Sequence, residues 1–241
     1  MTSAAPRERA IEQGGAALSR LAALRDSARP DTVARAAINA GLVSAAKALP
    51  SLPTTPGVFA TAFLTASQIL GESADPASVQ AALANEIPPA PLWAPKWAPT
   101  GARGAEVDQA FTILTHAGLA LAMAEAVSRR EFSARPEAVM ARSAVSSAIS
   151  RARDLLSGPE GEAGNLLAAL DAAMATYLTR IAADLAPLVH VSAGATLPAL
   201  WWSWYLHGDV VQASEIVARA KAPHPGFMPI TFQTVAPDAF A

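Results

Sequence analysis

Apolar residues recur three or four positions apart through most of the chain before Pro187, which is the spacing of one face of a helix. The predicted helices run from Arg7 to Arg25, from Asp31 to the residue before Pro50, from Val58 to Gly71, from Asp75 to about Asn85, from Ala105 onward, from Pro136 to near Gly158, and from Leu166 to Leu185. Asp31 and Asp75 stand where a helix N-cap is expected. The last three helices are roughly twenty residues each with short joins, so they predict an antiparallel bundle.

The hydrophobic pattern changes its period after Pro187. Leu188 to Val191 and Ile230 to Val235 alternate between apolar and polar positions, as half-buried strands do. Two short helices are predicted between them, with Thr196 placed to cap the first, Gly208 to end it and Asp209 to cap the second. The pattern therefore predicts a strand-helix-helix-strand module whose strands pair and whose helices supply the core. The candidates for this core are Leu200, Ile216 and Phe227, together with one face of the tryptophan-rich helix.

The segment between Glu86 and Gly104 follows neither pattern. It carries five prolines together with Trp93 and Trp97. The segment could be an extended linker, or an arm that packs on another subunit, or its indoles could fold back on their own helices. The expected fold class is mainly α, a helical bundle region followed by a small α+β module. Its regions are 1–85 (helical), 86–104 (linker or arm), 105–187 (helical bundle) and 188–241 (C-terminal module).

Composition narrows the function classes. Hydrophobic residues make up 52% of the chain and charged residues only 16%, and the net charge is −2, so no long-range field attracts nucleic acid or an acidic membrane. The chain has no cysteine, which excludes disulfides and thiolate chemistry. The N-terminal residues lack the apolar core of a signal peptide, and no uncharged apolar run approaches the length that spans a bilayer. A soluble protein, or one that joins an assembly, is expected.

The search for catalytic motifs gives no positive match. There is no glycine-rich phosphate loop, no metalloprotease motif and no nucleophile elbow. The histidines are scattered, at positions 116, 190, 207 and 224, and no carboxylate partner is evident for a metal site. A cluster of arginines at 129, 130, 135, 142, 151 and 153 could bind phosphate, but Glu125, Glu131, Glu137 and Asp154 are interleaved with it, so mixed ion pairs are expected. We therefore expect no enzymatic activity, no cofactor and no metal.

Four aromatic residues stand close together in the first helix of the C-terminal module: Trp201, Trp202, Trp204 and Tyr205. Residues 201 and 205 share one face of a helix, while 202 and 204 point elsewhere. Because so small a module cannot bury all four, part of this cluster is expected to be covered by a neighbouring subunit or partner. The expected interface residues are Trp93, Trp97, Trp201, Trp202, Trp204, Tyr205, His224 and Phe227.

The last fifty residues resemble the C-terminal end of the Mu-like phage DNA circularisation (DNA circulation) proteins. The motifs that carry the resemblance are Leu-Pro-Ala-Leu from Leu197, Tyr-Leu-His-Gly-Asp from Tyr205, Ala-Ser-Glu-Ile-Val-Ala-Arg from Ala213, and His-Pro-Gly-Phe-Met-Pro from His224. The stretch is also similar to a LysM module, a strand-helix-helix-strand unit of peptidoglycan binders and phage baseplates. The chain departs from the family at Ala220, where Asn is usual, and at Pro229, where a glycine-rich turn is usual. No part of these 241 residues resembles the family's larger N-terminal domain, so any activity housed in that domain is not expected here.

The resemblance implies a structural component of a phage tail or baseplate, as a hub or a tube-to-baseplate adaptor. Its expected partners are other tail and baseplate proteins, and a homo-oligomer, trimeric or hexameric, is expected to match tail symmetry. Neither a membrane nor a nucleic acid is expected as a partner. Such a protein is assembled in the host cytoplasm and ends in the virion. The alternatives are a LysM-type peptidoglycan-binding module and a protein that binds DNA ends.

Overall fold

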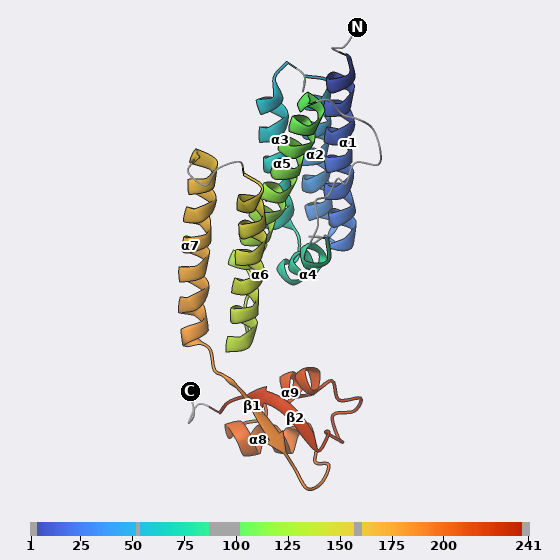
Figure 1. Cartoon of the computed structure of the whole chain (residues 1–241). Helices are drawn as coiled ribbons and strands as arrows, with labels where there is room; N and C mark the ends of the chain where they lie inside the picture. Colours follow the sequence, from blue (N-terminus) through green and yellow to red (C-terminus); the bar gives the residue numbers. More distant parts are fainter. Residues whose placement is uncertain (1–3, 52–53, 87–101, 157–160, 238–241) are drawn as a thin grey trace. The chain divides into compact units, whose positions relative to one another are not determined.

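A computed structural model describes residues 4–51, 54–86, 102–156 and 161–237 (Figure 1). In these residues the chain is mainly α-helical with two short strands, which confirms the predicted fold class. The chain divides into two compact units, described separately below. The helical unit comprises residues 1–130 and 143–175, and the C-terminal unit comprises 131–142 and 176–241. The first seven helices are α1 (Ala4–Ser27), α2 (Thr32–Ala48), α3 (Pro56–Ser73), α4 (Pro76–Glu86), α5 (Ala102–Ser128), α6 (Arg135–Asp154) and α7 (Glu162–Asp184), and a short 3-10 helix, Leu49–Ser51, follows α2.

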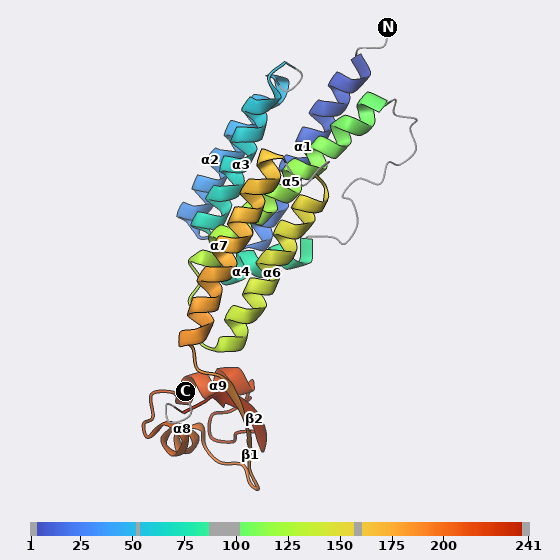
Figure 2. The ribbon, with the colours of Figure 1, turned by 60° about the vertical axis from the view of Figure 1, so that its left-hand side comes forward.

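Four helices close the helical unit into a bundle. Helix α2 packs on α3, α3 on α5, α5 on α1, and α1 on α2, while α4 lies against α1, α3 and α5 (Figure 2). Phe59 and Phe63 of α3 and Phe111 of α5 meet in its core, with ring centroids 6.1 Å apart for Phe59–Phe63 and 5.9 Å for Phe59–Phe111. The sequence predicted separate regions at 1–85 and 105–187, whereas the packing of α5 on α1 and α3 joins residues of both in one unit.

Helices α3 and α5 approach each other closely at two glycines. A Cβ atom on Gly71 would lie 2.6 Å from the carbonyl oxygen of Ala122, and one on Gly118 would lie 2.7 Å from Ser67 Oγ. Both distances are shorter than ordinary van der Waals contacts. At Gly71 the backbone of α5 therefore approaches to a separation that only glycine permits, and at Gly118 the side chains of Ser67 and Phe63 fill the space that a Cβ atom would need.

Side chains satisfy the main-chain groups at several helix ends. Asp31 accepts a hydrogen bond from the N–H of Ala34 (2.7 Å), and Asp75 accepts one from the N–H of Ser78 (2.8 Å), so both predicted caps are confirmed. The hydrogen bond from Ser78 also lowers the pKa of Asp75. At the C-terminal end of α3, Arg129 donates hydrogen bonds to the carbonyl oxygens of Gly71 and Ala74.

Two helices in the described residues, Val107–Ser128 and Glu162–Asp184, are long and apolar enough to cross a membrane when up to two charged residues are allowed. Both helices contain charged residues, so neither is an uncharged run. The most apolar window of the first is 67% buried inside the protein, as expected for the central helix of a bundle, whereas that of the second is only 17% buried. The α7 helix therefore presents much of its apolar surface outward.

The C-terminal unit begins where α6 and α7 lie side by side. Arg135 donates a main-chain hydrogen bond to the carbonyl of Ala186 (3.0 Å) and side-chain hydrogen bonds to those of Ala182 (3.0 Å) and Leu185 (3.1 Å). Arg142 donates to the hydroxyl of Thr179 (2.9 Å). The described hydrogen bonds of Arg129 and Arg135 thus go to carbonyl oxygens at or near helix ends, and that of Arg142 goes to a hydroxyl group within α7, rather than to the interleaved acidic residues.

The rest of the unit is the predicted strand-helix-helix-strand module, in the order β1 (Leu188–Ser192), α8 (Ala199–His207), α9 (Ala213–Ala220) and β2 (Thr231–Val235). The strands pair antiparallel, with Leu188 opposite Val235 and Ser192 opposite Thr231, so the predicted pairing is confirmed. Gly208 ends α8 in the left-handed conformation (φ 75°), also as predicted. The core that holds the module together consists of Ala199, Trp202, Ile216, Met228 and Phe232.

The two predicted helix caps in this module were wrong. Helix α8 begins after Pro198, not Thr196, because the Pro198 carbonyl accepts from the N–H groups of Trp201 and Trp202 and the N–H of Ala199 bonds to Pro225. Asp209 instead accepts from the N–H of Val211 (3.0 Å) in a turn before α9.

Two of the three predicted core residues were also misplaced. Leu200 and Phe227 are exposed, whereas Ile216 is buried as predicted. Met228 and Phe232 occupy the core instead, because the alternation of β2 turns Phe232 inward and the turn before it turns Met228, rather than Phe227, inward.

A polar cluster ties α9 to the start of α6. Arg219 bonds to Glu137 (3.1 Å), to Glu215 (2.9 Å) and to the hydroxyl of Ser133 (2.5 Å). Burial alone would raise the pKa of Glu137, but hydrogen bonds from Ser133 and Arg219 outweigh burial and hold the pKa below its ordinary value. The module is thereby joined to the loop and helix that precede it by a bond network as well as by the chain.

Substitution of Gly71 by Ala is expected to lower the free energy of unfolding by on the order of 1–3 kcal/mol, because the new methyl group meets a backbone carbonyl of α5. Gly15→Ala is the matched control, since a Cβ there meets nothing within 4 Å and should instead stabilise α1 by about 0.5–1 kcal/mol. Urea denaturation followed by circular dichroism measures both. Equal stability of the two variants would contradict the close approach.

Substitution of Glu137 by Gln is expected to destabilise the C-terminal unit at neutral pH. Because the folded state lowers the pKa of Glu137, its charge stabilises the fold above the unfolded pKa of about 4.3, and this contribution is lost as the pH falls through the folded pKa. The variant should therefore lose less stability than the parent on acidification below about pH 5. Thermal unfolding by tryptophan fluorescence at several pH values measures this. Glu215→Gln, at a more exposed partner of Arg219, should have the smaller effect.

Candidate functional site

Helix α8 is apolar on nearly its whole circumference. Its sequence is Ala-Leu-Trp-Trp-Ser-Trp-Tyr-Leu-His, so hydrophobic periodicity does not distinguish an inner from an outer side. In the structure Ala199, Trp202 and Ser203 are buried. The residues on the opposite arc, here named the aromatic face, are Leu200, Trp201, Trp204 and Tyr205.

The aromatic face is exposed but held in place from beneath. Leu200, Trp204 and Tyr205 are 60–62% exposed, and Trp201 is 38% exposed. The rings of Trp201 and Tyr205 stack 4.8 Å apart at an interplanar angle of 9°. Both rings contact Trp202 edge-on, at 4.9 Å and 6.1 Å. The face therefore presents large apolar rings whose conformational freedom is already restricted.

Trp202 joins the aromatic face to the core. It is only 5% exposed, and its ring meets that of Phe232 on β2 at 5.3 Å. Its indole N–H has no hydrogen-bond acceptor among the described residues, and its ring packs in the core with Ile216 and Met228. The sequence predicted Trp202 as an interface residue, which its burial corrects.

Further exposed apolar residues stand near the two ends of α8. Val211 follows its C-terminus and is exposed. At its N-terminus, the hydrogen bond from Ala199 to Pro225 (2.7 Å) holds the turn that carries His224 and Phe227. Their rings are 5.6 Å apart, and Nδ1 of His224 accepts from the N–H of Gly226 (2.9 Å). The predicted interface residues at 201, 204, 205, 224 and 227 are therefore exposed, whereas Trp93 and Trp97 lie outside the described residues.

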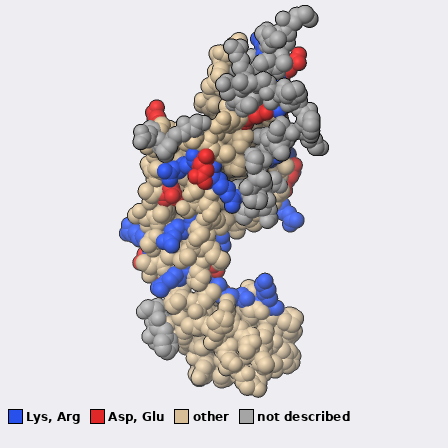
Figure 3. Space-filling view, viewed as in Figure 1, with Lys and Arg blue, Asp and Glu red and all other residues tan. Residues whose placement is uncertain are grey.

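The surroundings of the aromatic face carry little charge. Residues 188–237 contain four charged side chains, Asp209, Glu215, Arg219 and Lys221, and Glu215 and Arg219 pair with each other. Figure 3 accordingly shows the visible face of this module as almost wholly uncharged. A partner of this surface would be recognised by shape and apolar contact rather than by charge.

Among the described residues, the histidines do not gather with acidic side chains into a catalytic or metal-binding arrangement. His116 is buried in α5, where desolvation, and to a smaller extent the charges of Arg151 and Arg20, lower its pKa. His190 meets Gln233 across the strand pair at 2.8 Å. Across the described ranges, no three His, Cys, Asp or Glu side chains lie close enough together to hold a metal ion.

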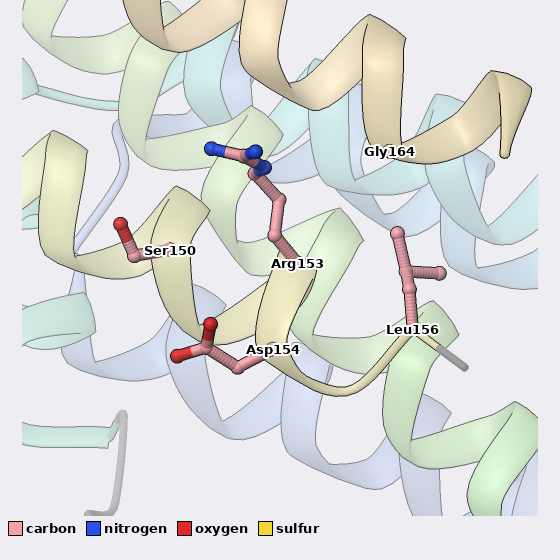
Figure 4. Close-up of a pocket in the computed structure, with 5 residues that line it drawn as sticks. All are labelled: Ser150, Arg153, Asp154, Leu156 and Gly164. Atoms are coloured by element: carbon pink, nitrogen blue, oxygen red, sulfur yellow. The ribbon is translucent and has the colours of Figure 1, made fainter. Parts of the chain in front are cut away.

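A small cavity of about 320 Å³ lies between the end of α6 and the start of α7 in the helical unit. Its lining residues are Ser150, Arg153, Asp154, Leu156 and Gly164. In Figure 4 the guanidinium group of Arg153 and the carboxylate of Asp154 point in different directions. The cavity therefore lacks the converging polar groups of a catalytic or phosphate-binding site, and the aromatic face is the stronger candidate.

The position of Leu200 could have been inferred from Trp204. Residues four apart share a helix face, so Leu200 is exposed wherever Trp204 is exposed. No local signal distinguishes Trp202 from Trp201, because α8 is apolar on nearly its whole circumference. The inward choice is made by Phe232, which is thirty residues away in the sequence.

Trp202→Ala is expected to lower the stability of the C-terminal unit by roughly 3–5 kcal/mol, because it removes the central ring of a small core. Trp204→Ala is the matched control on the same helix, and its effect should be within about 0.5 kcal/mol because the ring is largely exposed. Urea denaturation followed by circular dichroism measures both. Comparable losses in the two variants would show that the inward and outward sides of α8 are wrongly assigned.

The comparisons with known proteins yield no assignment for the aromatic face. No protein-family model matches the chain, and no curated protein matches it.

Proposed function

We propose that this protein is a structural component of a phage tail or baseplate, acting as a hub or a tube-to-baseplate adaptor through protein-protein assembly. The observation that carries the proposal is the aromatic face of α8, which leaves two tryptophans and a tyrosine at the surface of a module of about fifty residues. The motifs from Leu197 to Pro229 resemble those of Mu-like phage DNA circularisation proteins, which supports the tail assignment. The expected site of action is the virion.

The composition of the aromatic face favours a protein partner. Tryptophan and tyrosine are the residues most enriched at the energetic centres of protein interfaces. Because Trp201 and Tyr205 are already stacked on each other and on Trp202, binding would immobilise few additional rotamers. A partner with a complementary apolar surface would therefore gain binding free energy at a small cost in entropy.

A second candidate is peptidoglycan binding by the LysM-like module. The favouring observation is the exposed Trp201–Tyr205 pair, since aromatic rings also present apolar platforms to other ligands. DNA-end binding receives less support, because only two basic residues, Arg219 and Lys221, occur between 188 and 237, and Arg219 is paired. Peptidoglycan binding is distinguished from assembly in the experiment below.

Mass spectrometry of purified phage particles is expected to detect this chain among the tail and baseplate proteins. Trp204→Ser, introduced into the same phage genome, should reduce the amount of chain per particle, because loss of one central interface residue commonly weakens binding by about 2 kcal/mol or more, or roughly thirtyfold. The control is Val33→Ser, at an even more exposed apolar position on α2. It should leave incorporation unchanged.

Two outcomes would contradict the assembly proposal. One is the absence of the chain from particles that are otherwise complete. The other is normal incorporation of the Trp204→Ser variant together with loss of its sedimentation with insoluble peptidoglycan. The second outcome would assign the aromatic face to glycan binding instead.

A further inference from the structure

Helix α7 carries a second exposed surface that the aromatic face does not explain. Six positions spaced alternately four and three apart lie on one side of this helix: Glu162, Leu166, Ala169, Ala173, Thr176 and Arg180. All six are exposed, and Leu166 is 65% exposed. Because α7 is one uninterrupted helix, this stripe follows from helical geometry alone. The spacing is that of the a and d positions of a coiled coil.

The opposite side of α7 packs on the rest of the protein. Gly164, Met174, Leu178 and Ala182 are buried. The stripe is therefore the solvent-exposed side of α7, opposite the side that packs on the protein. Its middle is apolar and small, and each of its ends is charged.

The stripe is symmetric in a way that fits a second copy of itself. Positions 162 and 180 are equally far from residue 171, and so are 166 and 176, and 169 and 173. In an antiparallel helix pair whose two-fold axis passes beside residue 171, Glu162 of each copy faces Arg180 of the other. The small residues Ala169 and Ala173 face each other at the centre, where they let the backbones approach closely. Charge complementarity and shape thus select the same register.

We propose that α7 pairs antiparallel with α7 of a second copy of this chain, centred at residue 171. The pair is isologous, since each contact occurs twice by symmetry. It uses a surface separate from the aromatic face and goes beyond the proposed function. A two-fold contact of this kind fits a dimer or a hexamer with two-fold axes, but a simple trimeric ring does not contain it.

A membrane is the other occupant that the composition of α7 allows, and the observations favour a second copy. The buried and half-buried residues of α7 lie on the side opposite the stripe, so a bilayer could contact one side only. Helices that lie on membranes carry Lys and Arg along their polar face, whereas the exposed side of α7 bears Glu162, Arg180 and Asp184. The reciprocal charges of the stripe have no counterpart in a lipid surface.

The length of α7 sets the expected strength of the contact. Its 23 residues span about 34 Å, and a single helix pair of that length lies at the small end of specific interfaces. The dimer is therefore expected to be concentration-dependent. In an assembled particle the copies would be held together at high local concentration.

Cysteine cross-linking tests the register directly, because the natural chain contains no cysteine. Leu166→Cys and Thr176→Cys are made as separate full-length variants, mixed and oxidised. The antiparallel register predicts a disulfide between the two variants and little within either one, because like positions lie about 15 Å apart along the axis and a disulfide needs Cα atoms within about 7 Å. Cross-linking of each variant with itself and not with the other would indicate a parallel pair and overturn the proposal.

Sedimentation velocity over a range of concentrations provides the second test. Ala173→Glu should raise the dimer dissociation constant at least about tenfold without changing the circular dichroism spectrum, since the position is exposed in the single chain. Arg180→Glu should also weaken the dimer, and the double variant Glu162→Arg/Arg180→Glu should restore it. Trp204→Ala should dimerise normally, which separates this surface from the aromatic face. A chain that stays monomeric but sediments with phosphatidylcholine-phosphatidylglycerol vesicles, and loses this with Ala173→Glu, would overturn the proposal.

Discussion

The contact between Trp202 and Phe232 lies at the centre of the small core that stabilises the C-terminal module. Two paired strands of five residues are marginal in water without a packed face. Trp202 provides that face, because its ring meets the side chain that β2 turns inward, while Ile216 and Met228 close the remaining sides. The same ring supports Trp201 and Tyr205 from below. Folding of the module and presentation of its aromatic face therefore depend on one side chain.

Polar interactions play a different part in this protein. Charged residues are few, and several of the arginines bind main-chain oxygens: Arg129 binds the end of α3, and Arg135 binds the end of α7. An arginine in that role completes a helix terminus instead of attracting a ligand. The largely buried ion pair between Arg219 and Glu137 likewise has a structural role, since it joins α9 to the start of α6. The basic cluster seen in the sequence is thus largely structural where its contacts are described.

The features that could be predicted from the sequence are those with local causes. Asp31 and Asp75 were recognised as caps because a cap depends on residues two or three positions away. The strand pair was recognised because alternation is visible within five residues. The inward side of α8 could not be predicted, since the helix is apolar all round and the choice depends on Phe232. The predictions of caps at Thr196 and Asp209 were wrong because both helices begin later in the sequence, α8 after Pro198 and α9 after the turn at Val211.

The close contact of α3 with α5 has a consequence for how this protein can change over evolutionary time. Any replacement of Gly71 or Gly118 adds at least a methyl group where the neighbouring helix leaves no space, so these two positions are closed to gradual drift. Leu200, Trp204 and Tyr205 have no such restriction within their own chain. Variation in this protein should therefore concentrate on the outer side of α8, in step with whatever that side binds, while the contact between α3 and α5 stays constant.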